Sequence, residues 1–124
     1  MNTYTLGIDI GSTTVKIAIL DENDRLLFAD YERHFANIRE TLLDLIIKAK
    51  NALGNVNIHG MITGSGGMSI SKYIHVPFVQ EVISVSSALG YFAPKTDVAI
   101  ELGGEDAKII YFENGNVEQR MNGI

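Results

Sequence analysis

One stretch of sequence decides the fold of this chain: GIDIGSTTVKIAILD, residues 7–21. Apolar residues alternate with other residues on both sides of a short polar turn, and this period is typical of half-buried strands. The alternation predicts strands over 3–10 and 14–21. A second turn, DENDR at 21–25, precedes a third predicted strand over 26–33. Three antiparallel strands are therefore expected to open the chain.

The sequence period then changes from that of a strand to that of a helix. A helix is predicted from Asn37, as N-cap with Glu40 in the capping-box position, to Gly54 as a left-handed stop. Further elements are predicted downstream in the order strand, helix, short extended piece, helix and three strands: 57–63, 68–74, 75–81, 82–92, 97–102, 107–113 and 116–121. Asn114-Gly115 is a strong hairpin signal for the last turn.

The order of these elements predicts an α/β fold. Its first part is a domain with a mixed five-stranded sheet, expected over 1–95. The three final strands begin a second, similar domain, expected over 96–124. A three-stranded sheet alone leaves an apolar face and an edge strand uncovered. We therefore expect a homodimer or strand exchange through 97–121.

The opening motif occurs twice. IDIGSTTVKIAILDEND from Ile8 aligns without a gap with IELGGEDAKIIYFENGN from Ile100. The alignment pairs an acid with an acid, a glycine with a glycine and a lysine with a lysine: Asp9 with Glu101, Gly11 with Gly103, and Lys16 with Lys108. The spacing matches one small α/β unit, so the sequence indicates two related units in tandem.

The two glycine-containing turns suggest a binding site for phosphate and metal. Glycines allow close approach of the backbone, and successive backbone N–H groups in a turn form a concave anion site. In the first turn, which begins at Gly11, the hydroxyls of Ser12, Thr13 and Thr14 add hydrogen-bond donors. Asp9 would repel phosphate unless a cation lies between them, and Mg²⁺ meets that need. Gly64 and Ser65 follow a strand, at the end where α/β proteins bind ligands.

Composition excludes several classes of function. The 124 residues are 46% apolar, carry a formal net charge of −5 and include no cysteine. No Lys/Arg cluster is present, so neither nucleic acid nor an anionic membrane is an expected partner. The absence of cysteine excludes thiol catalysis in this chain and fits a cytoplasmic location, and the start has no signal-peptide pattern. His34, His59 and His75 are isolated, without metal-ligand spacing.

These motifs resemble a known superfamily. GIDIGSTTVKIAILD is similar to the first phosphate loop, and IELGGEDAKIIYF to the second, of the actin, sugar-kinase and heat-shock-chaperone ATPases. QEVISVSSALGYFAP (80–94) resembles their connecting helix. ITGSGG, PFVQEV and VEQRMNG are similar to the activator ATPases of 2-hydroxyacyl-CoA dehydratases and the ATPase subunits of benzoyl-CoA reductase. The resemblance implies a ribonuclease-H-like, actin-like ATPase fold and covers essentially the whole chain.

The resemblance also implies roles for individual residues. Asp9 would hold the water shell of Mg²⁺, and Gly11 to Thr14 would wrap the β- and γ-phosphates of ATP or ADP. Glu101 keeps the charge of the usual second-loop aspartate, and Gly103 and Gly104 would approach the phosphate from the other side. Glu81 would orient the attacking water. Lys16 and Lys108 either reach phosphate or point outward.

In the resembled family, the MNG stretch runs into a cysteine that ligates a [4Fe–4S] cluster shared by two subunits. That cysteine would follow Ile124. The resemblance thus implies a longer ATPase that passes an electron to a dehydratase or reductase, with this part expected to be inactive alone. The alternatives are a sugar or acid kinase of the same superfamily, an inert fold fragment, and a ribonuclease-H-type nuclease. The nuclease would need further carboxylates that the strand 57–63 does not supply at its end.

Overall fold

The structure, a computed structural model, describes residues 3–104, 107–113 and 116–123, the last range as backbone only. The chain divides into two compact units, Met1–Phe78 and Val79–Ile124. This division falls before helix α3 (Glu81–Phe92), which therefore belongs to the second unit. The predicted limits of 1–95 and 96–124 instead place this helix in the first domain, and they stay a prediction.

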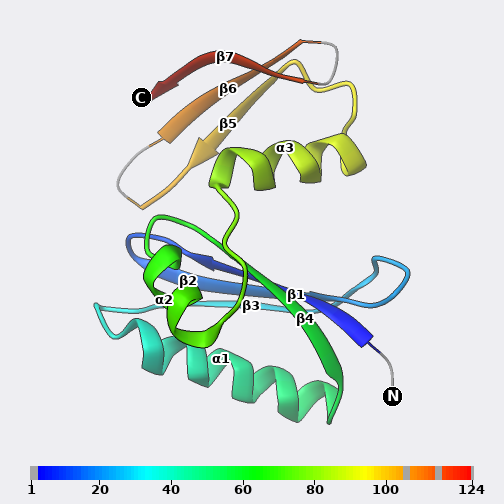
Figure 1. Cartoon of the computed structure of the whole chain (residues 1–124), viewed down its shortest axis with the longest axis vertical. Coiled ribbons are helices and arrows are strands. Elements are labelled where there is room, and N and C mark those ends of the chain that lie inside the picture. The colour runs from blue at the N-terminus through cyan, green and yellow to red at the C-terminus, as the bar shows by residue number, and fades with distance from the viewer. Residues whose placement is uncertain (1–2, 105–106, 114–115, 124) are drawn as a thin grey trace. The chain divides into compact units, whose positions relative to one another are not determined.

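The first unit contains a four-stranded mixed sheet in the order β3-β2-β1-β4 (Figure 1). Its strands are β1 (Thr3–Ile10), β2 (Thr14–Leu20), β3 (Leu26–Arg33) and β4 (Asn57–Thr63). β1, β2 and β3 form the predicted antiparallel meander, and β4 pairs with β1 in parallel. The helices are α1 (Ile38–Leu53), which lies along one face of the sheet, and α2 (Gly67–Ile74).

The core of the first unit lies between the sheet and α1. The strands contribute alternate residues, and α1 contributes positions spaced by three and four: Ile8, Ile10, Val15, Ile17, Ile19, Ile62, Leu42, Leu45 and Ala49. Burial of these side chains is the main driving force for folding this unit. Because side chains alternate along a strand, the odd-numbered residues of β1, including Asp9, lie on the face opposite α1.

The prediction of a five-stranded sheet is wrong. The sheet has four strands, and the expected fifth is reduced to one isolated parallel bridge between Ile62 and Phe78. The amide of Ile62 donates to the carbonyl of Pro77 at 2.8 Å. Pro77 has no N–H with which to continue the ladder, and α3 begins at Glu81, so no strand can extend from this bridge.

The residues at which α1 begins and ends are as predicted, but the local structure at both ends differs from the prediction. Asn37 is the N-cap residue and makes no side-chain capping bond. Its carbonyl oxygen instead accepts from the Thr41 amide at 3.1 Å and from Thr41 Oγ1 at 2.7 Å. Gly54 ends the helix with φ 77° and ψ −159°, which is not the predicted left-handed helical conformation but is also essentially restricted to glycine. None of the described helices is long and apolar enough to cross a membrane.

Lys48 connects α1 to β3 on the surface. Its ammonium group contacts Glu32 and lies 3.5 Å from Asp30 Oδ2. The hydrogen bond to Glu32 and the two negative charges raise the pKa of Lys48 above its ordinary value. Lys48 is therefore charged at neutral pH, and it loses its part in the ion pairs as the pH rises through that pKa.

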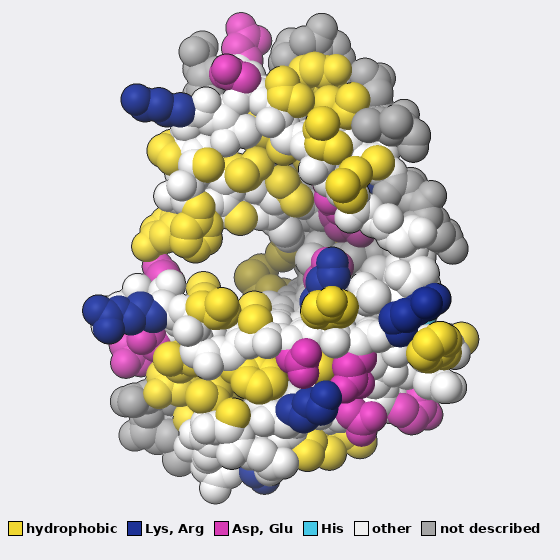
Figure 2. Space-filling model, turned by 180° about the vertical axis from the view of Figure 1, so that it is seen from behind, with side chains coloured by type: hydrophobic (Ala, Val, Ile, Leu, Met, Phe, Trp, Pro, Cys, Tyr) yellow, Lys and Arg dark blue, Asp and Glu magenta, His cyan; other side chains and the backbone are white. Residues whose placement is uncertain are grey.

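The second unit is α3 followed by a three-stranded antiparallel sheet in the order β5-β6-β7. Its strands are β5 (Val98–Leu102), β6 (Ala107–Glu113) and β7 (Asn116–Gly123). Ile110 and Phe112 of β6 are buried, whereas the apolar side chains of β5 that alternate with Ala99 and Glu101 are exposed: Val98, Ile100 and Leu102. Apolar side chains are visible on the face of the molecule that Figure 2 draws. The predicted Asn114-Gly115 turn lies outside the described residues.

The sequence repeat is also a structural repeat. Asp9 pairs with Lys16 between β1 and β2, and Glu101 pairs with Lys108 between β5 and β6. The next strand pair keeps the same correspondence, because Ile17 faces Asp30 and Ile109 faces Asn122. Both units therefore build the same three-stranded meander in the same register.

Candidate functional site

Asp9 lies at the centre of a polar row that crosses the sheet of the first unit. Its neighbours in register are Lys16 of β2 and Thr63 of β4. Side chains directly opposite each other share a face of the sheet, so these three lie on the face opposite α1. Asp9 and Thr63 are half-buried, and Lys16 is exposed. The structure thus places the predicted metal-binding acid at the end of β1, beside a lysine and a threonine.

The glycine-rich loop after β4 packs directly against Asp9. Gly64 is buried and has φ 101°, and a Cβ atom built on it would lie 2.6 Å from Asp9 Oδ1 and 2.2 Å from the Ile10 carbonyl oxygen. The Gly66 amide donates to that same carbonyl oxygen at 2.9 Å. Only glycine fits at position 64. The structure therefore brings Gly64 to the predicted site, while Ser65 is exposed beside it.

The first glycine turn connects β1 to β2. The Gly11 amide donates to the Thr14 carbonyl oxygen at 2.9 Å, which closes the turn. This amide is therefore used inside the turn. The donors that the turn can offer a phosphate are the amides and hydroxyls of Ser12, Thr13 and Thr14, of which Ser12 is exposed and the other two are half-buried.

His34, which is isolated from other metal-binding residue types in the sequence, contacts this turn. The His34 amide donates to the Thr13 carbonyl oxygen at 3.0 Å, and its Nε2 lies 3.0 Å from the Gly11 carbonyl oxygen. The signal available in the sequence was indirect. Once β2 and β3 pair in the observed register, Thr14 faces Arg33, so residue 34 must lie beside residue 13. No local spacing reveals a contact between residues that are 23 positions apart.

The second unit gathers three of the predicted residues. Glu81 is the first residue of α3, and Lys108 Nζ donates to Glu81 Oε2 at 2.7 Å. Lys108 also faces Glu101 across the β5–β6 ladder. Lys108 thus lies between two acids, and the structure favours neither phosphate contact nor an outward direction for it. Gly103 and Gly104 follow β5 and are exposed.

The Asp9 neighbourhood suits a metal held through water. Among the described residues, no three His, Cys, Asp or Glu side chains come together as a metal site. The buried Thr63 hydroxyl oxygen, in register with Asp9, makes no hydrogen bond within the described part of the chain. A carboxylate and a hydroxyl are oxygen ligands of the kind that Mg²⁺ accepts, and Mg²⁺ commonly keeps several waters. The chemistry of these two residues is therefore compatible with Mg²⁺.

Lys108 is expected to hold Glu81 in place. Replacing it in Lys108→Met removes the ammonium partner of a carboxylate that is only 22% exposed. We expect the free energy of unfolding to fall by about 1 kcal/mol, because both groups remain partly hydrated. Urea unfolding at neutral pH measures this, with Lys95→Met, an exposed lysine of the same unit, as the matched control. Equal unfolding free energies for the two variants would show that the pair contributes nothing.

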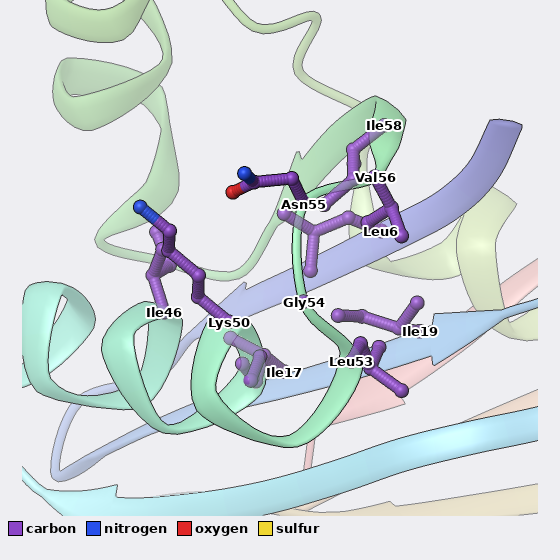
Figure 3. A pocket seen from close by; sticks show the side chains of 11 residues that line it. Leu6, Ile17, Ile19, Ile46, Lys50, Leu53, Gly54, Asn55, Val56 and Ile58 are labelled. Carbon is purple, nitrogen blue, oxygen red and sulfur yellow. The ribbon is translucent and has the colours of Figure 1, made fainter. Parts of the chain in front are cut away.

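An apolar pocket lies elsewhere in the first unit (Figure 3). It has a volume of about 280 Å³ and lies between the last turns of α1 and the strands, with residues such as Leu6, Ile19, Leu53 and Ile58 in its wall. Lys50 and Asn55 add polar groups to its lining. None of the residues predicted for the phosphate site lines it, so it is not that site.

No protein-family model matches the chain. An uncharacterised protein of Methanocaldococcus jannaschii is 30% identical over 116 residues, which are 90% of this chain and 45% of that protein. The (R)-2-hydroxyglutaryl-CoA dehydratase activating ATPase of Acidaminococcus fermentans is 27% identical over 124 residues, which cover 94% of this chain and 45% of that protein. The chain therefore spans about half the length of the curated relatives that it matches.

Solved structures show the same relationship. The activator of the 2-hydroxyisocaproyl-CoA dehydratase from Clostridium difficile, solved with bound ADPNP, superposes with a TM-score of 0.77 and 25% identity. The match covers 98% of this chain and 45% of that protein. The fold is that of the actin-like ATPases. Within that class, the chain resembles the activators of 2-hydroxyacyl-CoA dehydratases, as its motifs predicted.

Proposed function

We propose that this chain supplies the Mg²⁺- and phosphate-binding part of an ATPase that activates a 2-hydroxyacyl-CoA dehydratase or a related reductase. One observation carries the proposal. Asp9 is the penultimate residue of β1, and it lies between a closed glycine turn and a glycine loop that approaches its carboxylate too closely for any other residue. The same strand, acid and lysine recur in the second unit, in the same register. The dehydratase activators that the chain resembles support the choice of reaction.

The proposed chemistry is mainly electrostatic. Phosphoryl transfer requires the γ-phosphate to be held and its charge to be neutralised, and bound Mg²⁺ supplies that neutralisation. Asp9 would hold the metal's water shell. In the first unit, Ser12, Thr13 and Thr14 would donate hydrogen bonds to phosphate oxygens. Gly103 and Gly104 hold the corresponding positions in the repeat of the second unit and would bind phosphate in the same way. Glu81 would orient the attacking water, with Lys108 fixing the direction of its carboxylate.

The redox part of the proposal concerns the longer protein. A [4Fe–4S] cluster needs cysteine thiolates, and this sequence contains none, so no residue here fits as a cluster ligand. We therefore derive no electron-transfer step from this chain. The dehydratase or reductase partner and a cytoplasmic location belong to the same proposal about the longer ATPase.

Calorimetric titration with Mg·ADP and Mg·ATP tests the proposed function. We expect binding in the presence of Mg²⁺ and much weaker binding when EDTA removes the metal, because Asp9 then repels the phosphates directly. Binding that does not depend on Mg²⁺, or no binding of either nucleotide, would contradict the assignment. A phosphorylated sugar or acid formed from Mg·ATP would instead indicate a kinase of the same superfamily.

We further propose that the chain self-associates through residues 97–121. β5 is an edge strand, and Val98, Ile100 and Leu102 are 48%, 61% and 76% exposed. An apolar edge strand of this kind favours pairing with a second copy. In sedimentation at high protein concentration, we expect wild type to dimerise and Ile100→Lys/Leu102→Lys to remain monomeric. The matched control is Leu43→Lys, at a leucine that is 56% exposed on α1 and should leave the dimer intact. A monomeric wild type would refute the proposal.

A further inference from the structure

We propose that His34 is a positioning residue that aims the first glycine turn at phosphate. It does so by binding two carbonyl oxygens of the turn, so that the amides of Ser12 and Thr14 face the opposite direction. This inference rests on the proposed function, since it assigns a donor set to the same phosphate site.

The bonds of His34 determine which ring nitrogen carries the hydrogen. His34 Nδ1 accepts a hydrogen bond from the Ala36 amide at 3.0 Å. A nitrogen that accepts carries no hydrogen, so in the neutral ring the hydrogen is on Nε2. Nε2 therefore donates to the Gly11 carbonyl oxygen, 3.0 Å away. The tautomer follows from this hydrogen-bond network.

The directions of these two carbonyl groups also determine where the amides of the next residues point. In a trans peptide, the C=O of one residue and the N–H of the next point in opposite directions within one plane. The Gly11 carbonyl points at the His34 ring, so the Ser12 amide points away from it. The Thr13 carbonyl points at the His34 amide, so the Thr14 amide points away as well. His34 thus fixes two peptide planes of the turn.

The ring itself is held in place. His34 is only 7% exposed, and its carbonyl oxygen accepts from the Asn37 amide at 2.6 Å. The next two residues, Phe35 and Ala36, have φ values of 46° and 67°, which cost energy in residues other than glycine. The bond from Ala36 to Nδ1 is one of the contacts that hold this strained segment. The imidazole of His34 therefore links the glycine turn to the strained segment that leads into α1.

A turn that begins with glycine needs contacts that fix the directions of its carbonyl groups. Glycine restricts its backbone least of all residues, so a turn that begins at Gly11 can rotate a carbonyl toward the bound anion. A carbonyl oxygen in that position would repel phosphate. By holding the Gly11 and Thr13 carbonyls on its own side, His34 leaves amide hydrogens on the other side, as an anion site requires.

Two substitutions separate positioning from packing. His34→Gln places an amide N–H at the reach of Nε2 and can keep the bond to the Gly11 carbonyl oxygen. His34→Asn is too short for that bond but can accept from the Ala36 amide, as Nδ1 does. Both replace a buried ring with a smaller amide, so a purely packing role would affect them alike.

The first readout is the turn itself, measured by hydrogen exchange of the Gly11 amide in the full chain. That amide bonds to the Thr14 carbonyl oxygen, so its protection reports the closed turn. We expect the Gly11 amide to exchange about tenfold faster in His34→Asn than in wild type, because a factor of about ten corresponds to the loss of one ordinary hydrogen bond. In His34→Gln we expect exchange near the wild-type rate. Unchanged exchange in His34→Asn would overturn the proposal.

The second readout is binding of Mg·ADP. We expect His34→Asn to weaken binding about tenfold relative to His34→Gln, while urea unfolding shows the two variants to be equally stable. Equal affinities of the two variants would overturn the positioning role even if wild type binds well. Failure of wild type to bind Mg·ADP would instead count against the proposed function, and the exchange experiment would still decide whether His34 positions the turn.

Discussion

Asp9→Asn is expected to weaken Mg·ADP binding at least about a hundredfold. The carboxylate is the acid at the end of β1, between the turn of Gly11 and the loop of Gly64. Asparagine keeps the shape of the side chain and removes its charge. The water shell of a bound Mg²⁺ would then lose its anionic contact, while the polar row with Lys16 and Thr63 would keep a side chain of similar size.

Calorimetry with Mg·ADP measures this loss, and two controls make it specific. Asp44→Asn removes an exposed carboxylate from α1, so it changes the net charge equally and should bind as wild type does. Urea unfolding should show that Asp9→Asn remains folded. If Asp9→Asn bound within about threefold of wild type, a difference below 1 kcal/mol, Asp9 would have no part in holding the metal.

Gly64→Ala is expected to lower the free energy of unfolding of the first unit by about 3 kcal/mol, from backbone strain and steric overlap together. At φ 101° an alanine is strained, and its Cβ would lie 2.2 Å from the Ile10 carbonyl oxygen and 2.6 Å from Asp9 Oδ1. The nearest of these atoms belongs to the backbone of β1. The strand or the loop must therefore move, and Asp9 moves with it.

Gly54→Ala is the matched control for Gly64→Ala. Gly54 also has positive φ, 77°, but a Cβ built there meets no atom within 4 Å. Its substitution should cost only the backbone strain, about 1–2 kcal/mol. Urea unfolding of both variants separates strain from overlap. Equal losses would show that the contact between the glycine loop and Asp9 is not tight in solution.

Local pattern was enough to predict most elements of the fold. Alternation over residues 7–21 predicted the first hairpin, and helical spacing from Ile38 to Leu53 predicted α1 with its correct ends. These predictions succeed because each depends on neighbours within a few positions in the chain. The repeat also follows from sequence alone, since equal spacing of an acid, a glycine and a lysine produces the same strand register in both units.

The remaining features depended on contacts between distant residues. The expected fifth strand is a single bridge, because Pro77 has no N–H to donate to the sheet. The direction of the Lys108 side chain depends on its hydrogen bond to Glu81 of α3. His34 looked isolated because its partners lie on a turn that only the β2–β3 register brings to it. The sequence by itself determined the strands, the helices, the repeat and the acid–glycine turns, because these are local patterns. Only the tertiary structure decided which groups hold those turns in place. The hydrogen bonds that do so join residues far apart in the sequence, and no local sequence pattern indicates such pairs.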